Sequence, residues 1–71
     1  MEKRTVKIIQ VPVELYKILK FENIAASGGE AKYLITDGQV MVNGNMETRK
    51  RKKIFPGDRV EACGVMIEII E

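Results

Sequence analysis

The spacing of apolar residues changes near residue 38, and this change constrains the fold more than any other feature. Between residues 14 and 37, apolar side chains recur every three or four positions, as they do on one face of a helix. From Gln39 onward they alternate with polar side chains or form short runs between turn residues, as in strands. We therefore expect helices in the first half of the chain and a sheet in the second.

The first predicted helix covers about Glu14–Asn23. Leu15, Ile18 and Leu19 form its apolar stripe at the spacing i, i+3 and i+4. Pro12 is expected to open this helix, because the first turn does not need the N–H that proline lacks.

The second predicted helix covers about Gly28–Asp37, with Ala31, Leu34 and Ile35 on its apolar stripe. Ser27 and Glu30 have the spacing of a capping box, in which each side chain accepts a hydrogen bond from the backbone N–H of the other. Gly38 follows as a residue free to take positive φ, which is typical of a helix end.

Short strands are predicted on both sides of the helices. An N-terminal strand covers Thr5–Val11, and the later ones are separated by the turn signals Asn43-Gly44 and Pro56-Gly57-Asp58. The later strands are Gln39–Val42, Met46–Thr48, Ile54–Phe55, Arg59–Cys63 and Val65–Ile70. The expected fold class is α+β: two short helices packed on a small, mostly antiparallel sheet, with an added N-terminal strand.

The length of 71 residues predicts one domain, residues 1–71. No apolar run approaches the roughly 20 residues that span a bilayer, and no signal peptide is evident, so we expect a cytoplasmic protein without a membrane partner. The chain has no histidine and a single cysteine, Cys63, which lies in an apolar strand and is expected to be a buried thiol. We therefore expect no enzyme, no metal site and no cofactor.

Charge is concentrated in one segment. The five consecutive cations Arg49, Lys50, Arg51, Lys52 and Lys53 form a basic segment, while the rest of the chain carries seven positive and ten negative charges. Such a run in a loop is typical of a phosphate-binding surface. It is equally typical of a solubilising loop or of lysines that protect a sheet edge.

A second candidate surface is the start of the second helix, Ser27-Gly28-Gly29. Free N–H groups at a helix start attract anions, and glycines let a phosphate approach the backbone. The alternative is an ordinary capped turn, and Glu30 already supplies negative charge there. Lys17, Lys20 and Lys32 are predicted on the outer faces of the helices, where a solvated polar face is the usual explanation.

Four aromatic residues are scattered along the chain, at Tyr16, Phe21, Tyr33 and Phe55. They are too few and too dispersed to predict a platform for stacked bases. We expect most of them in the core or at its rim.

The stretch Leu15–Val60 resembles the RNA-binding domain first seen in ribosomal small-subunit protein four, the S4 domain. The resemblance rests on a Leu-rich helix ending in Lys20-Phe21 and on the ordered motifs that follow it. These motifs are Ala26-Ser27-Gly28-Gly29-Glu30-Ala31-Lys32, Leu34-Ile35, Gly38-Gln39-Val40, Val42-Asn43-Gly44 and Pro56-Gly57-Asp58-Arg59-Val60. The Ser-Gly-Gly-Glu-Ala-Lys version is similar to small stand-alone bacterial members.

The resemblance implies binding of structured RNA, ribosomal or transfer RNA, through the two helices and the adjacent loop. By position it implies a surface made of Lys20, Ser27, Gly28, Gly29, Lys32 and the basic segment, and we add Lys17. Many S4 domains have arginine at the position of Gly28, so contact there would come from backbone N–H groups. The expected partners are structured RNA and ribosomal or assembly proteins, and the expected state is a monomer.

Two other functions fit parts of the sequence. A β-grasp carrier shares the Val-Asn-Gly and Gly-Asp signals, but sulfur carriers need a C-terminal Gly-Gly tail and the last residues here are Ile69-Ile70-Glu71. A protein–protein adaptor in a ribosome-linked complex stays open. The RNA hypothesis requires that the glycine-rich helix start and the basic segment lie side by side.

Overall fold

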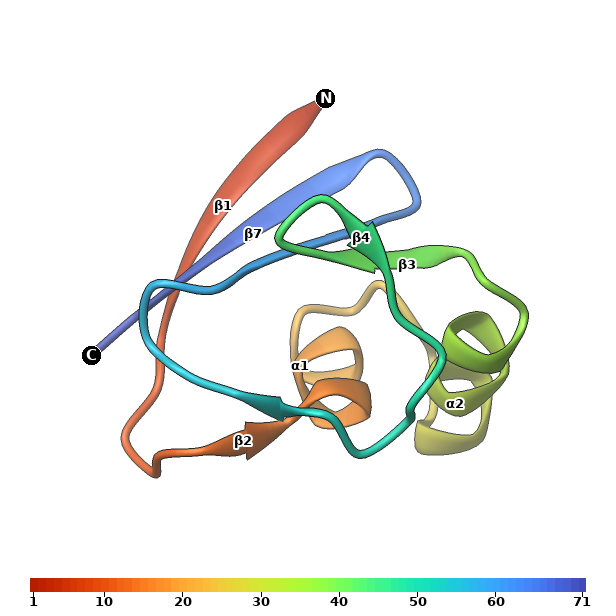
Figure 1. Cartoon of the computed structure of the whole chain (residues 1–71), viewed down its shortest axis with the longest axis horizontal. Coiled ribbons are helices and arrows are strands. Elements are labelled where there is room, and N and C mark those ends of the chain that lie inside the picture. Colours follow the sequence, from red (N-terminus) through yellow and green to blue (C-terminus); the bar gives the residue numbers. More distant parts are fainter.

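The computed structural model describes residues 1–71 and contains seven strands and two helices (Figure 1). In chain order they are β1 (Glu2–Lys7), β2 (Val13–Glu14), α1 (Leu15–Phe21), α2 (Gly28–Thr36), β3 (Val40–Val42), β4 (Asn45–Met46), β5 (Lys53–Ile54), β6 (Arg59–Ala62) and β7 (Val65–Ile70). The α+β class predicted from the sequence is confirmed. Neither helix has the length and the apolar character needed to cross a membrane.

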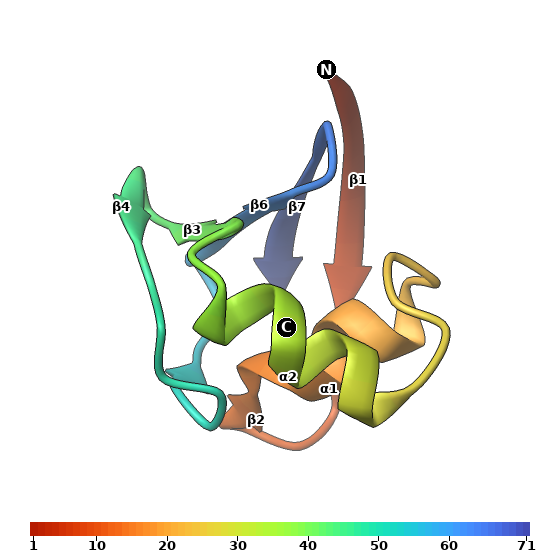
Figure 2. The same cartoon turned by 90° about the vertical axis from the view of Figure 1, so that its right-hand side faces the viewer.

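Five strands form one sheet in the order β1-β7-β6-β3-β4, and β2 pairs with β5 in a separate two-stranded ribbon. Only the pairing of β1 with β7 is parallel, so the sheet is mostly antiparallel, as predicted. The two helices lie together on one side of the sheet (Figure 2). All 15 buried residues are apolar; most come from the two helices and the strands, and Ile8 and Ala25 lie in connecting segments.

The N-terminal boundaries differ from the prediction. The first strand covers Glu2–Lys7 instead of Thr5–Val11, because its parallel partner β7 ends at Ile70, which pairs with Lys7. Pro12 does not open a helix. Val13 and Glu14 instead pair with Ile54 and Lys53, so α1 begins only at Leu15.

The second helix agrees closely with its prediction, since it begins at Gly28 and ends at Thr36. The Ser27 hydroxyl accepts a hydrogen bond from the Glu30 N–H at 3.1 Å. The reciprocal bond from the Ser27 N–H to the Glu30 carboxylate is not formed, so that half of the predicted capping box was wrong. Gly38 follows the helix with φ of 79°, as expected for a helix end.

Two predictions of burial were wrong. Cys63 is exposed with φ of 52°, because Ala62 pairs with Val65 and leaves Cys63-Gly64 as the two-residue turn between β6 and β7. The aromatic side chains do not enter the core either. Phe21, Tyr33 and Phe55 are 65%, 62% and 49% exposed, and Tyr16 is half-buried at the core's edge.

Candidate nucleic-acid interface

The basic segment, residues 49–53, crosses the start of α1 and is bound to it through the backbone (Figure 1). The N–H of Leu15 donates to the carbonyl of Lys52 at 2.9 Å, and the N–H of Tyr16 donates to the carbonyl of Lys50 at 3.2 Å. At the end of the segment, Lys53 pairs with Glu14 in the β2–β5 ribbon. The main chain is therefore held in place while the charged side chains project away from it.

The Tyr16 ring is the meeting point of three segments. The Lys32 ammonium, from α2, lies 4.7 Å from the ring centroid. The Arg51 guanidinium carbon, from the basic segment, lies 5.7 Å from it, and the Lys17 ammonium lies 6.0 Å from it. A cation within about 6 Å of an aromatic face is attracted by the ring's negative face. One half-buried tyrosine thus gathers positive charge from both helices and from the loop.

The glycine-rich start of α2 borders the same ring. A Cβ atom placed on Gly28 would lie 3.8 Å from Cε2 of Tyr16, an ordinary van der Waals distance. Because Gly28 and Arg51 both adjoin Tyr16, the helix start and the basic segment lie on the same side of the molecule. The predicted proximity of these two regions is confirmed.

The start of α2 has unused hydrogen-bond donors. The Glu30 N–H donates to the Ser27 hydroxyl and the Ala31 N–H to the Ser27 carbonyl, whereas the N–H groups of Gly28 and Gly29 donate to no group of the protein. Gly29 is exposed. These two donors stand at the positive end of a nine-residue helix, where an anion is favoured.

Glu14 organises two of the cations. Its carboxylate lies 3.3 Å from the Lys17 ammonium and 3.4 Å from the Arg51 guanidinium. Desolvation raises the pKa of Glu14, but the hydrogen bond from Lys17 and the charges of Lys17, Arg51 and Lys53 outweigh it, so the pKa is lowered overall. The carboxylate therefore stays ionised and holds both cations near Tyr16.

Arg49 is also ion-paired. Its guanidinium lies 2.9 Å from the Glu47 carboxylate, and this hydrogen bond lowers the pKa of Glu47 from 4.5 to about 2. The other candidate cations have no carboxylate within 4.0 Å: Lys20, Lys32, Lys50, Lys52 and Lys53. These five ammonium groups are free to meet phosphates.

Most of the predicted surface residues are therefore neighbours, with one exception. Lys20 lies exposed in the last turn of α1 and is not among the cations around Tyr16. Tyr16 itself was missed, because four scattered aromatics give no pattern. The only sequence signal was its place beside Lys17 on the polar side of the first helix.

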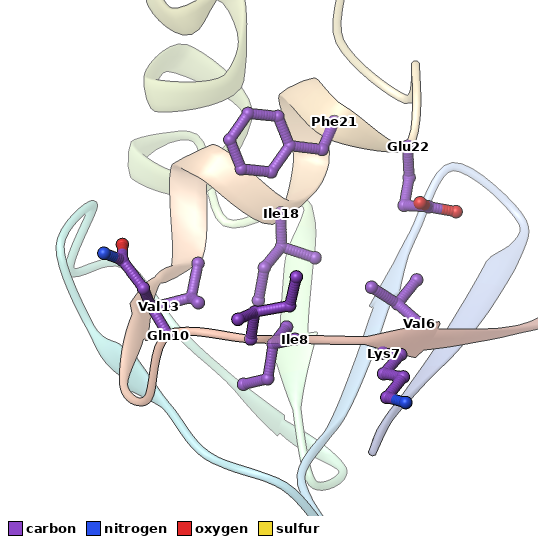
Figure 3. A pocket seen from close by; sticks show the side chains of 9 residues that line it. Val6, Lys7, Ile8, Gln10, Val13, Ile18, Phe21 and Glu22 are labelled. Carbon is purple, nitrogen blue, oxygen red and sulfur yellow. The ribbon is translucent and has the colours of Figure 1, made fainter. Parts of the chain in front are cut away.

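A second surface feature is apolar. A hollow of about 370 Å³ lies between the end of β1 and α1, with Ile18 and Phe21 on its α1 side and Val6 and Ile8 on its β1 side (Figure 3). Ile9, also in its lining, is 95% exposed. Tyr16 is not among the residues that line this hollow, so the hollow lies on a different face of α1 from the cations around Tyr16.

The side chains around Tyr16 suit the binding of an anion. No group of three His, Cys, Asp or Glu side chains is placed to hold a metal ion. The cations around Tyr16 and the open amides of α2 offer ammonium, guanidinium and amide donors, which bind phosphate oxygens. The nearby carboxylates of Glu14 and Glu47 are engaged in ion pairs.

The chain is similar to two bacterial proteins whose names refer to RNA or to ribosomes. The chain is 45% identical over 58 residues to the Putative RNA-binding protein YbcJ of Escherichia coli, covering 82% of this chain and 83% of YbcJ. It is 35% identical over 52 residues to the Probable ribosome maturation protein RlbA of Bacillus subtilis, covering 73% of each.

The solution structure of YbcJ from E. coli, described as revealing a motif involved in RNA binding, superposes with a TM-score of 0.72. The superposition covers 94% of this chain and 86% of YbcJ at 41% identity. The family model of the S4 domain matches residues 6–70, nearly the whole chain. The chain belongs to the S4 domain family.

Proposed function

We propose that this protein binds structured RNA without catalysing a reaction, and that the RNA is ribosomal. The observation that carries the proposal is the Tyr16 cluster, which puts the open amides of α2 beside the basic segment. RNA presents phosphates at regular spacing, and a surface with both amide and cationic donors can meet several of them at once.

The relatives support both levels of the proposal. YbcJ is named for RNA binding, and RlbA is named for ribosome maturation. The first name favours RNA as the ligand, and the second favours ribosomal RNA over transfer RNA. The absence of histidine in the sequence favours a binding role over acid–base catalysis.

Filter binding of a ribosomal RNA fragment at several salt concentrations tests the proposal. The test variant replaces Lys50, Lys52 and Lys53 with Gln, because these lysines of the segment have no carboxylate partner. The matched control replaces Lys3, Lys7 and Arg59 with Gln, which removes the same charge from β1 and β6. We expect the test variant to reduce the slope of log K against log[salt] by roughly 2 to 3, as for three phosphate contacts.

The control variant should change that slope by less than half as much. If both variants weaken binding equally, the attraction depends on net charge alone and the proposed surface is wrong. Crosslinking followed by sequencing of the bound RNA then tests the ribosomal assignment, which fails if ribosomal fragments are not enriched.

A second candidate function is that of a protein–protein adaptor, and the apolar hollow of Figure 3 favours it. An exposed isoleucine beside an apolar hollow is a feature that protein interfaces share. Phe21→Glu should remove a protein partner bound there while RNA affinity is unchanged. If the same substitution abolishes RNA binding and leaves protein capture intact, this second function is excluded.

A further inference from the structure

A hollow of about 360 Å³ opens on the basic segment, and its lining combines cationic side chains with one aromatic ring. Four cationic residues surround it, Arg49, Arg51, Lys52 and Lys53, and the fifth lining residue is Phe55. Arg51 also belongs to the Tyr16 cluster, so the hollow continues the proposed RNA surface.

Phe55 is exposed because the backbone on both sides of it is fixed. Ile54 is fully buried, and the alternation of side chains along the chain then directs Phe55 outward. The Phe55 N–H donates to the Asp58 carboxylate at 2.8 Å, and the Asp58 N–H donates to the Phe55 carbonyl at 3.1 Å. Gly57, with φ of 98°, completes the tight turn. The ring therefore cannot be withdrawn into the core by a small local shift.

An aromatic ring among cations matches one class of ligand. Nucleobases stack on aromatic rings, while ammonium and guanidinium groups bind the phosphates on either side of the base. Lys52 and Lys53 have no carboxylate partner, so two cations of the lining are free for phosphates. A base inside a duplex is already stacked on both faces, so only an unpaired base can lie against Phe55.

We infer that the hollow between the basic segment and Phe55 binds one unpaired nucleotide, with its base on the Phe55 ring and its phosphates on the surrounding cations. This inference rests on the proposed function and narrows it. The preferred RNA carries a bulged nucleotide flanked by paired segments, in place of an uninterrupted duplex. The paired part of that RNA extends toward Tyr16 and the start of α2.

Three RNA hairpins test the inference: one with a single bulged adenosine, one with an abasic site in the bulge, and one fully paired. The chain contains no tryptophan, so Phe55→Trp introduces a single tryptophan reporter at the hollow. We expect its emission to be quenched by the bulged hairpin and not by the other two. Phe55→Leu, which keeps apolar bulk without a ring, should weaken binding of the bulged hairpin about tenfold. The abasic hairpin should bind Phe55→Leu and the parent protein equally well.

The outcomes separate this inference from the proposed function. If all three hairpins bind equally with a strong salt dependence and none quenches the emission of the Phe55→Trp variant, the unpaired-nucleotide site is wrong while RNA binding stands. If Phe55→Leu weakens all three hairpins equally, the ring acts on the fold of the segment and the inference also fails. If none of the hairpins binds at low salt, both proposals are overturned. Circular dichroism of each variant verifies that the fold is retained.

Discussion

The two helices begin in opposite ways. At the start of α1, the N–H groups of Leu15 and Tyr16 are bonded to carbonyls of the basic segment. At the start of α2, the N–H groups of Gly28 and Gly29 are open. Both helix starts carry the same partial positive charge. One start is used inside the protein to position a loop, and the other is left for an external anion.

The residues before each helix explain the difference. Glu14 makes no side-chain cap and is extended in a strand, so the chain brought in by its partner strand β5 supplies the acceptors. Ser27 caps α2 through its own hydroxyl, so no other segment is needed there. A locally capped helix can thus remain accessible, while a helix capped by tertiary contacts cannot.

The largest effect is expected from a substitution at the start of α1, whose N–H groups are bonded within the protein. Leu15, the first residue of α1, is fully buried, and Leu15→Ala should lower the free energy of unfolding by about 2 to 5 kcal/mol through the cavity it leaves. Urea denaturation measures this. Ile9→Ala removes similar apolar atoms from a site that is 95% exposed and should change stability by less than about 0.5 kcal/mol. Equal losses in the two variants would contradict the packing described for α1.

The next largest effect is expected when one of the open N–H groups at the start of α2 is removed. Gly28→Pro removes one free N–H at the first helical position, where proline is tolerated, and Ser27 already has the extended backbone that proline requires (φ −151°, ψ 167°). We expect RNA affinity to fall about tenfold, as for one hydrogen bond to a charged group, with stability maintained. Gly28→Ala keeps the N–H and is the control. If both variants bind alike in filter binding, the amide makes no contact.

A smaller effect is expected from replacing Tyr16, whose ring, at the start of α1, borders the start of α2. Tyr16→Leu removes the ring face shared by Lys17, Lys32 and Arg51, and should weaken RNA binding about fivefold, since each exposed cation–π contact contributes about 0.5 to 1 kcal/mol. Tyr16→Phe keeps the ring face and should bind like the parent protein. A loss of affinity in Tyr16→Phe would instead show that the hydroxyl is the important group.

The smallest effect is expected from the ion pair between Glu47 and Arg49, the first residue of the basic segment. The lowered pKa of Glu47, about 2 instead of 4.5, means that its pairing with Arg49 stabilises the fold above pH 4.5 and is lost as the pH falls toward 2. Because Arg49 is largely exposed, Glu47→Gln should cost about 1 kcal/mol or less at pH 7. Denaturation from pH 7 to pH 2 should show the parent and the variant converging. A constant difference across that range would exclude the ion pair as its cause.

Local features were predicted well. The start of α2 at Gly28 and the Asn43-Gly44 turn follow from interactions within a few residues, so the sequence contains all the atoms involved. The buried stripe of Leu15, Ile18 and Leu19 follows from helical spacing. Residues 49–52 of the basic segment form a loop and Lys53 lies exposed in the short strand β5, because adjacent cations are not buried in an apolar core.

Two of the errors come from strand pairings with distant residues. Pro12 stays outside the helix and Phe55 points outward because β2 pairs with β5. Each pairing fixes a register, and a shift of one residue moves a side chain to the opposite face. No pattern within a short window contains that information.

The amino-acid sequence by itself determined the helices, the turns, the position of the positive charge and the resemblance to the S4 domain, because these depend on neighbouring residues and on ordered motifs. Only the tertiary structure decided that Tyr16 joins both helices to the basic segment, and that Phe55 stands beside free lysines. Those contacts arise when the β2–β5 ribbon brings residues about forty positions apart into register, and backbone hydrogen bonds then hold them there.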